Sequence, residues 1–293
     1  MKGEFESVKA QTIEFAARFG FVTNELYFKY LSPVARTQKY KYWARLANEG
    51  FLTRARSSKE VFFLTPKART SIDIIAVPAR DIYLIPHDLI VAQFLLEIKS
   101  TLLIAEYWTE YDLKSNAGEA RHVLGCSQLL KFPDLVLEMN GKEGPLKIAV
   151  EIERSQKTKS RYRQLAYSYL QAKGLDFLIF GCAYQSIEQI VLSAFSGEIF
   201  SRASKSPATF LIPDLDKSGL EMTAKFCEHK MSMRKMLLAA LKLKENDRDL
   251  NRDNLGIAVP RLSRFKENNH EEIAGENIEI APTTCLPLAL RAS

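Results

Sequence analysis

The sequence predicts an α+β fold in which a small helical domain with one β-hairpin precedes a larger α/β core. Three observations predict it. Residues 5–70 show three helical stretches followed by two short apolar runs. Residues 131–170 have the pattern strand, hairpin, strand, helix, and Asn140-Gly141 is a strong hairpin signal. Residues 176–182 are almost all apolar, which is typical of a strand buried on both faces.

The N-terminal domain, residues 1–72, is expected to hold three helices and a hairpin. Gly20 ends the first helix, the second runs to Leu31, and Ser32-Pro33 starts the third with a capping residue and a proline at the first helical position. Two strands, at 51–56 and 60–64, follow the third helix. Helix, helix, helix, hairpin is the order of a winged helix, which is a form of the helix-turn-helix unit.

Basic side chains are concentrated in the third helix and the hairpin. Between residues 31 and 70, nine Lys or Arg stand against two Glu, a surplus of seven that exceeds the net charge of +6 of the whole chain. Such a surplus favours DNA, whose phosphates Lys and Arg neutralise. The alternative is a protein-binding domain with merely solvated basic residues. We expect the DNA contacts to come from Arg36, Lys39, Lys41, Arg45, Arg54, Arg56 and Lys59.

The second domain, residues 73–215, is expected to be an α/β core. A connector with strand character should cover 71–86, and an amphipathic helix should begin at His87 and end near Leu103. The expected elements that follow are a strand at 104–114, a polar loop and a Leu-rich segment up to 133, strands at 134–139 and 146–153, a helix up to 170, a strand at 176–182, a helix at 186–196 and a strand at 208–213. A C-terminal helix at 216–245 and a loosely ordered polar tail at 246–293 complete the expected organisation.

Three carboxylates meet at one edge of the predicted sheet. Pairing the two strands around Gly141–Gly144 brings Asp134 beside Glu151 and Glu153, and alternation puts the two glutamates on one face. Clustered carboxylates repel unless a proton or cation lies between them, and Mg²⁺ or Mn²⁺ favours such oxygen ligands. The alternative is that the glutamates decorate a solvated sheet face.

The order Pro133-Asp134, hairpin, Glu151-x-Glu153, basic helix resembles the PD-(D/E)xK nuclease superfamily. It is most similar to the replication-relaxation proteins of plasmid mobilisation, which join a winged helix to a core of this restriction-endonuclease-like kind. The resemblance implies that Asp134 and Glu151 bind metal and that Glu97, on the preceding helix, contributes a third acid. The replication-relaxation proteins also resemble this chain in having a histidine near the position of His87, which we interpret as a structural or capping residue.

Glu153 departs from the family pattern, which usually has lysine at that position. Lys157, Lys159 or Arg161 would supply the missing positive charge, since residues 154–163 hold five basic residues and no acid. The resemblance thus implies Asp134, Glu151, Glu153 and Lys157 as catalytic residues, with Lys159 and Arg161 on the DNA. A solvated helix that balances nearby acids is the alternative for this basic segment.

Two functions stay open at this point. The first is a Mg²⁺- or Mn²⁺-dependent DNA endonuclease or nicking relaxase that acts in plasmid or mobile-element replication or mobilisation. The second is a regulator that binds DNA through the winged helix and uses a degenerate nuclease fold for dimerisation or partner contact. Double-stranded DNA is the expected partner in both, and a second copy of the chain or replication and mobilisation proteins are further partners.

Composition excludes several other classes. Four cysteines lie far apart without a Cys-x-x-Cys pair, which argues against a zinc ribbon and fits a reducing compartment. The N-terminal stretch lacks the apolar centre of a signal peptide, and no run of about 18 apolar residues occurs. We therefore expect a cytoplasmic protein that does not contact a membrane.

Overall fold

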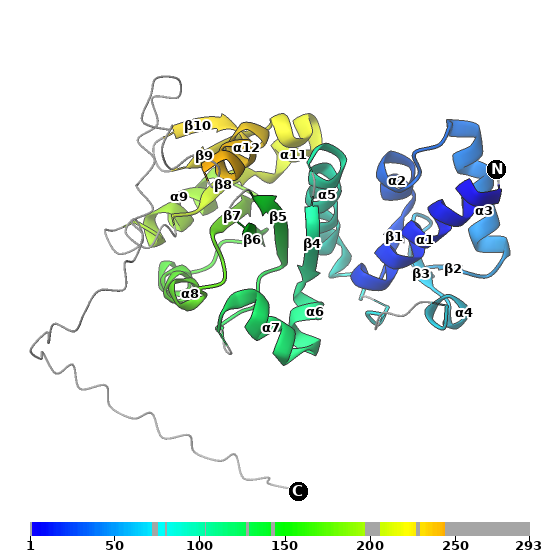
Figure 1. The fold of residues 1–293 in the computed structure, drawn as a ribbon, viewed down its shortest axis with the longest axis horizontal. Helices are drawn as coiled ribbons and strands as arrows, with labels where there is room; N and C mark the ends of the chain where they lie inside the picture. The colour runs from blue at the N-terminus through cyan, green and yellow to red at the C-terminus, as the bar shows by residue number, and fades with distance from the viewer. Residues whose placement is uncertain are drawn as a thin grey trace, which may run out of the picture. The chain divides into compact units, whose positions relative to one another are not determined.

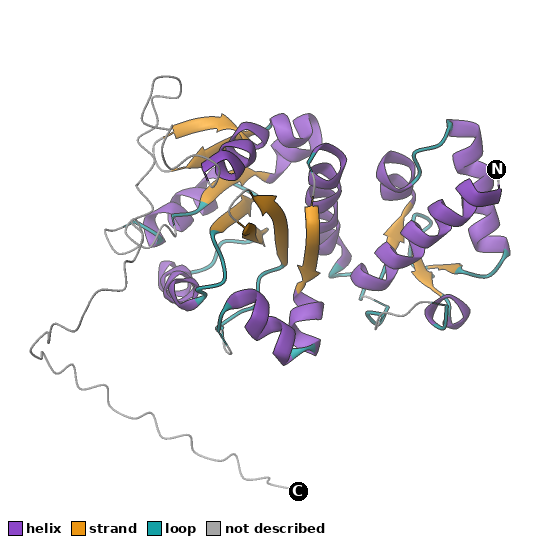
Figure 2. Ribbon diagram, in the orientation of Figure 1, coloured by secondary structure: helices purple, strands orange, loops and turns teal. Residues whose placement is uncertain are grey.

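The computed structural model describes residues 2–71, 76–79, 81–102, 104–126, 129–141, 144–196, 206–226 and 229–243. Helices and strands alternate along these residues, as Figures 1 and 2 show. The α+β class expected from the sequence is confirmed. Among the described helices, none is both long enough and apolar enough to cross a membrane.

The N-terminal region contains helices and one small antiparallel sheet. Its strand order is β1-β3-β2, with Val22 opposite Phe62 and Leu52 opposite Leu64. Thr23 caps the second helix by accepting a hydrogen bond from the backbone N–H of Leu26. The elements are α1 (Lys2–Phe19), β1 (Val22–Thr23), α2 (Asn24–Leu26), the π-helical turn η1 (Tyr27–Leu31), α3 (Arg36–Asn48), β2 (Leu52–Arg54), β3 (Val61–Leu64) and α4 (Pro66–Arg69).

The core is built on one seven-stranded mixed sheet with the order β10-β9-β8-β7-β6-β5-β4. The pairs β6-β7 and β7-β8 are parallel, and the other neighbouring pairs are antiparallel. The strands are β4 (Ile104–Thr109), β5 (Leu135–Gly141), β6 (Gly144–Glu153), β7 (Phe177–Cys182), β8 (Ala208–Leu211), β9 (Thr223–Phe226) and β10 (His229–Ser232).

Helices cover both faces of this sheet, so each face has its own apolar cluster (Figure 1). On one face, Val150 and Ile152 of β6 pack in the cluster that includes α5 (Ile85–Thr101) and α12 (Met233–Leu243). On the other, Ala149 belongs to the cluster of α7, α8 and α9. The bounds of those three helices are Ala117–Leu124, Lys159–Gln171 and Gln185–Ala194; the shorter helices are α6 (Glu110–Ser115), α11 (Ile212–Ser218) and the 3-10 turn η2 (Gly219–Glu221).

Two expected segments fold differently. The strand expected at 104–114 ends at Thr109, because Thr109 and Asp112 form a capping box that starts α6. The polar loop expected after it contains α7, which Asn116 caps at its start. In the connector expected at 71–86, the described residues form no strand; Pro78 within it has no N–H to donate to a neighbouring strand.

The C-terminal part of the core also differs from expectation. The single helix expected at 216–245 is replaced by η2, the antiparallel hairpin β9-β10 and the shorter helix α12. In residues 222–226, the apolar Met222, Ala224 and Phe226 alternate with Thr223 and Lys225, and this alternation is a strand signal that the expected helix did not take into account. The hairpin extends the sheet beyond β8. The tail expected at 246–293 lies outside the described residues.

Two glycines join the end of α7 to the segment after α8. Gly125 has a φ of 67° and ends α7, and the backbone N–H of Gly174 donates to the carbonyl of Leu124 at 3.0 Å. A Cβ on Gly125 would lie 2.5 Å from the backbone nitrogen of Gly174, and one on Gly174 would lie 2.5 Å from the carbonyl oxygen of Val123. Only two residues without side chains allow this approach of backbone to backbone.

Candidate functional site

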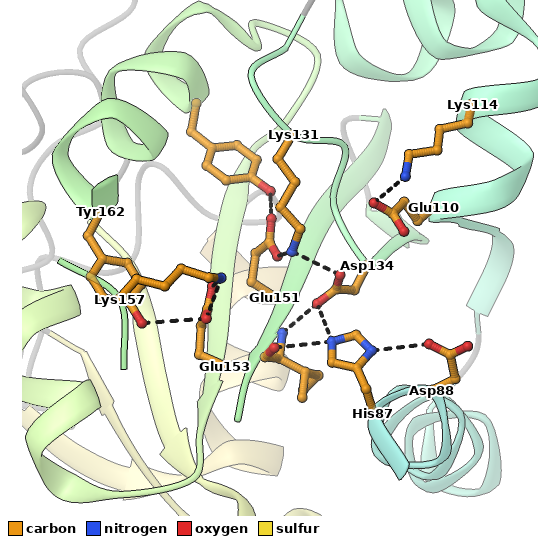
Figure 3. A network of polar contacts seen from close by, with 12 residues as sticks. His87, Asp88, Glu110, Lys114, Lys131, Asp134, Glu151, Glu153, Lys157 and Tyr162 are labelled. Carbon is orange, nitrogen blue, oxygen red and sulfur yellow. Dashed lines mark hydrogen bonds and ion pairs between the residues drawn. The ribbon is translucent and has the colours of Figure 1, made fainter. Parts of the chain in front are cut away.

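Asp134 and Glu151 lie side by side where β5 begins and β6 nears its end. The strands pair with Leu135 opposite Val150, which places the residue before β5 next to Glu151. The backbone N–H of Ile152 donates to Asp134 Oδ2 at 2.7 Å and fixes that carboxylate. The hairpin geometry expected from the sequence thus brings these two acids together, as Figure 3 shows.

Glu151 and Glu153 point to the face of the sheet opposite Val150 and Ile152. There, Tyr169 of α8 donates a hydrogen bond to Glu151, and Tyr162 of the same helix donates to Glu153 at 3.4 Å. Both glutamates are only 1% exposed. The interpretation that they decorate a solvated sheet face is therefore wrong.

A lysine from the segment before β5 bridges the two acids. The Lys131 Nζ lies 3.0 Å from Asp134 Oδ1 and also donates to Glu151 Oε2. The neighbouring Leu130 N–H donates to the Ser168 hydroxyl of α8 at 2.9 Å, which ties this segment to the helix. Lys131 was not among the sequence candidates, yet it is the cation on which both carboxylates converge.

His87 reaches the same cluster from the first turn of α5. Its Nε2 lies 3.2 Å from both Asp134 Oδ2 and the carbonyl oxygen of Ile152, and its Nδ1 lies 3.1 Å from Asp88 Oδ1. Burial lowers the pKa of His87, but the hydrogen bonds and charges of Asp134 and Asp88 outweigh it and raise that pKa to about 10. The imidazolium holds Asp134 and is not merely a helix cap.

The pKa values of the two acids shift in opposite directions. Burial alone would raise the pKa of Asp134, but the hydrogen bond from His87 and the charge of Lys131 outweigh it, so that pKa lies below its ordinary value. Burial, with the adjacent charge of Asp134, instead raises the pKa of Glu151. Burial and the charge of Glu151 raise the pKa of Tyr169 as well, so its hydroxyl remains a donor.

Lys157 belongs to Glu153 rather than to the pair. Its Nζ lies 2.6 Å from each oxygen of Glu153, and its side chain is 38% exposed. Lys159 and Arg161 are exposed in the first turn of α8, which Thr158 caps by accepting from the Arg161 N–H. Of the basic residues named as replacements for the missing lysine, Lys157 alone contacts a glutamate of the motif.

The structure does not bring Glu97 to the pair. Its Oε1 accepts from Lys29 Nζ at 3.0 Å and from the Tyr30 hydroxyl at 2.5 Å. An α-helix rises by about 1.5 Å per residue, so Glu97 lies about 15 Å along α5 from His87. The first turn of α5 faces the carboxylates, and the turn that carries Glu97 faces other partners.

The donor set fits a divalent cation that keeps several waters. In the described residues, no group of three or more His, Cys, Asp or Glu side chains is arranged to hold a metal ion, so the protein would supply the carboxylates of Asp134 and Glu151. Mg²⁺ is commonly bound by one or two carboxylates, with waters and substrate phosphate completing its shell. An ammonium already contacts both carboxylates, which shows that their oxygens converge on one cation-sized point.

A small cavity lies beside Asp134, and neither Glu151 nor Lys131 lines it. The cavity has a volume of about 20 Å³, roughly the space of a single water, and is lined by residues that include His87, Asp88, Glu110 and Asp134. A phosphate group approaching Asp134 through this cavity would have to displace side chains.

The basic residues of the N-terminal region divide into two groups. Lys39 donates to the Phe28 carbonyl at 2.6 Å, and Arg45 pairs with Glu49 at 2.5 Å and lies 3.8 Å from the centre of the Phe5 ring. The other candidates are exposed on α3, β2 and the turn that follows it, and we call them the basic surface: Arg36, Lys41, Arg54, Arg56 and Lys59.

Of the two cations that hold the acids, Lys131 was absent from the sequence candidates, and His87 was expected only as a structural or capping residue. A Lys three residues before Asp134 and a His-Asp pair at a helix start were the only available signals, and neither indicates a spatial partner. Searches against protein-family models, curated proteins and solved structures found no match for this chain.

Proposed function

We propose that this protein binds double-stranded DNA through its N-terminal region and hydrolyses or nicks a phosphodiester bond with its core in a metal-dependent reaction. The observation that carries the proposal is the convergence of Asp134 and Glu151 on one cation, Lys131, at the edge of two paired strands. The family resemblance adds an expected setting, the replication or mobilisation of a plasmid or other mobile element.

The order of elements in the core supports the nuclease-like part of the proposal. Helix α5, the antiparallel strands β4, β5 and β6, helix α8 and the parallel strand β7 occur in this order along the chain, with α6 and α7 inserted between β4 and β5. This is the order of helix, three strands, helix and strand expected from the PD-(D/E)xK resemblance. Asp134 and Glu151 stand where that resemblance expects metal ligands.

The N-terminal elements support the winged-helix part. Helices α1, α2 and α3 precede the β2-β3 hairpin, and β1 adds a third strand beside β3. The basic surface lies on α3 and the hairpin, which are the elements that enter or flank a groove in such units. Exposed Lys and Arg there would neutralise phosphates.

Each residue of the core cluster has a role in this proposal. Asp134 and Glu151 would hold Mg²⁺ or Mn²⁺, which when bound polarises the phosphate and lowers the pKa of a bound water. His87 fixes the orientation of Asp134. Lys159 and Arg161, exposed at the start of α8, would hold the DNA backbone beside the carboxylates. Glu153 keeps Lys157 close to the same edge.

The test is incubation of the full chain with supercoiled plasmid and Mg²⁺ or Mn²⁺. We expect relaxed or linear plasmid from the unmodified protein and none from Asp134→Asn or Glu151→Gln. Glu138→Gln is the matched control, because Glu138 lies on β5 and pairs with Lys147 at 3.6 Å, outside the cluster. Cleavage that persists in both cluster variants would refute the assignment of the carboxylates.

A second function is favoured by one specific observation. The ammonium of Lys131 already neutralises the two acids, and Glu153 stands where the family pattern has lysine. Both features are expected of a regulator that binds DNA without cleaving it and uses the core for dimerisation or partner contact. Plasmid that stays intact with every divalent metal, while gel shifts show DNA binding by the unmodified and variant proteins, would establish the second function.

A further inference from the structure

We propose that Lys131 is a resident counter-ion with two positions, one between Asp134 and Glu151 in the metal-free protein and one on the DNA phosphate when metal is bound. The inference rests on the proposed function, because it concerns the same carboxylate pair. It predicts that metal and DNA bind cooperatively and that Lys131 is the residue that couples them.

The first step is that, when both acids of the pair are ionised, they require a positive charge between them. Asp134 is 6% exposed and Glu151 is 1% exposed, so water cannot screen the repulsion between them. Removing the partner of a buried charge is strongly destabilising. In the structure, Lys131 contacts both acids, so a divalent cation that bound the same two oxygens would displace its ammonium.

The second step is that Lys131 is free to leave, whereas the other cation on Asp134 is not. His87 is held by Asp134, Asp88 and the carbonyl of Ile152. Lys131 is held only at the end of a flexible four-carbon side chain that is 25% exposed. The backbone beside it stays anchored through Leu130 and Ser168, so its ammonium moves by side-chain rotation alone.

The third step is where the ammonium goes. A metal that enters between Asp134 and Glu151 repels it, and a phosphate bound to that metal offers new oxygen acceptors within the reach of the side chain. Without DNA, the displaced ammonium has only water, so metal binds weakly. With DNA, the phosphate accepts it and metal binds more tightly. By linkage, metal must strengthen DNA binding by the same factor.

The experiment measures Mn²⁺ binding to the full chain from the electron paramagnetic resonance signal of free Mn²⁺, with and without a duplex oligonucleotide. In the absence of DNA, we expect Lys131→Met to bind Mn²⁺ about tenfold more tightly than the unmodified protein, because the competing ammonium is gone. Duplex DNA should raise the Mn²⁺ affinity of the unmodified protein about tenfold and that of Lys131→Met much less.

Three further variants make the result decisive. Lys131→Arg keeps the competing charge and should stay close to the unmodified protein. Lys114→Met is the matched control, because Lys114 pairs with Glu110 at 2.8 Å outside the carboxylate pair. Asp134→Asn should lose Mn²⁺ binding. If Lys131→Met does not fold, as judged by circular dichroism, Lys131→Gln takes its place, since its amide retains one donor.

The outcomes separate this inference from the proposed function. If the unmodified protein binds Mn²⁺ through Asp134 and the Lys131 variant binds it equally or more weakly, the two-position lysine is wrong and the metal site stands. If neither protein binds Mn²⁺ more tightly than Asp134→Asn does, the metal site and the inference both fail. Tighter binding by Lys131→Met without any coupling to DNA would refute the second position on the phosphate.

Discussion

The N-terminal region and the core use charge in opposite ways. In the N-terminal region, the basic surface is exposed, and nine basic residues between 31 and 70 stand against two acids. In the core, Asp134, Glu151 and Glu153 are buried, and each contacts a cation supplied by the chain itself. Exposed charge of one sign is available to a partner, whereas buried and paired charge fixes the geometry of the protein.

The comparison predicts that loss of a core charge affects stability most. Asp134→Asn leaves Lys131 and His87 near a neutral group and should lower the free energy of unfolding by about 3 kcal/mol, because breaking a buried ion pair strands its partners. Urea unfolding of this variant beside Glu138→Gln measures the difference. If the two variants lose the same free energy of unfolding, Asp134 contributes no more to stability than a surface charge does.

In the N-terminal region, the expected effect is on binding and not on stability. The triple change Arg54→Ala, Arg56→Ala, Lys59→Ala should weaken DNA binding at least tenfold, about 1.4 kcal/mol. The slope of the logarithm of the binding constant against the logarithm of the salt concentration should become shallower by about 0.9 for each phosphate contact that is lost. The free energy of unfolding of the triple variant should change by less than about 0.5 kcal/mol. Arg45→Ala serves as a contrast, since Arg45 forms an ion pair with Glu49 within the protein. DNA affinity that survives the triple change would contradict the basic surface.

The pH dependence of stability should carry the signature of His87. Its pKa is raised from 6.5 to about 10, so the folded protein binds more protons than the unfolded chain between these values. The contribution is complete below pH 6.5 and is lost as the pH rises towards 10. His87→Gln should flatten this decline by up to about 1 kcal/mol per pH unit. Parallel urea curves at several pH values test this, and identical slopes would exclude a charged His87.

The smallest effect is expected at Glu153. Its partner Lys157 is 38% exposed, so water receives the ammonium when the glutamate is neutralised. Glu153 itself is buried, but glutamine keeps an oxygen that can accept from Tyr162, so Glu153→Gln should cost only about 1 kcal/mol, the size of one hydrogen bond. A loss as large as that of Asp134→Asn, measured in the same urea titration, would remove the distinction between the two acids.

The sequence was sufficient to predict the contacts that follow from local rules. A hairpin signal at Asn140-Gly141 and the alternation of side chains were enough to bring Asp134 beside Glu151. The capping box of Thr109 and Asp112, and Asn116 before α7, are also local signals, and they were available to correct the strand and loop expected there. Element order in the core follows from such signals.

The remaining contacts of the site join residues that are far apart in the sequence, and they depend on how the helices and strands pack. Lys131 is three residues from Asp134 but 20 residues from Glu151, and His87 is 65 residues from Ile152, so their contacts depend on how α5 and the segment before β5 pack. Glu97 shows the converse, since an acid on the expected helix belongs to a turn that faces other residues.

The paired glycines at the ends of α7 and α8 constrain how this chain can vary. A Cβ on Gly125 would lie 2.5 Å from the backbone nitrogen of Gly174, and a Cβ on Gly174 would lie 2.5 Å from the carbonyl oxygen of Val123. A substitution at either glycine is therefore blocked, and changing both would add one clash to the other. No stepwise route leads away from this contact while the two helix ends stay together. A variant that replaces either glycine should therefore lose the close contact between the end of α7 and the segment after α8.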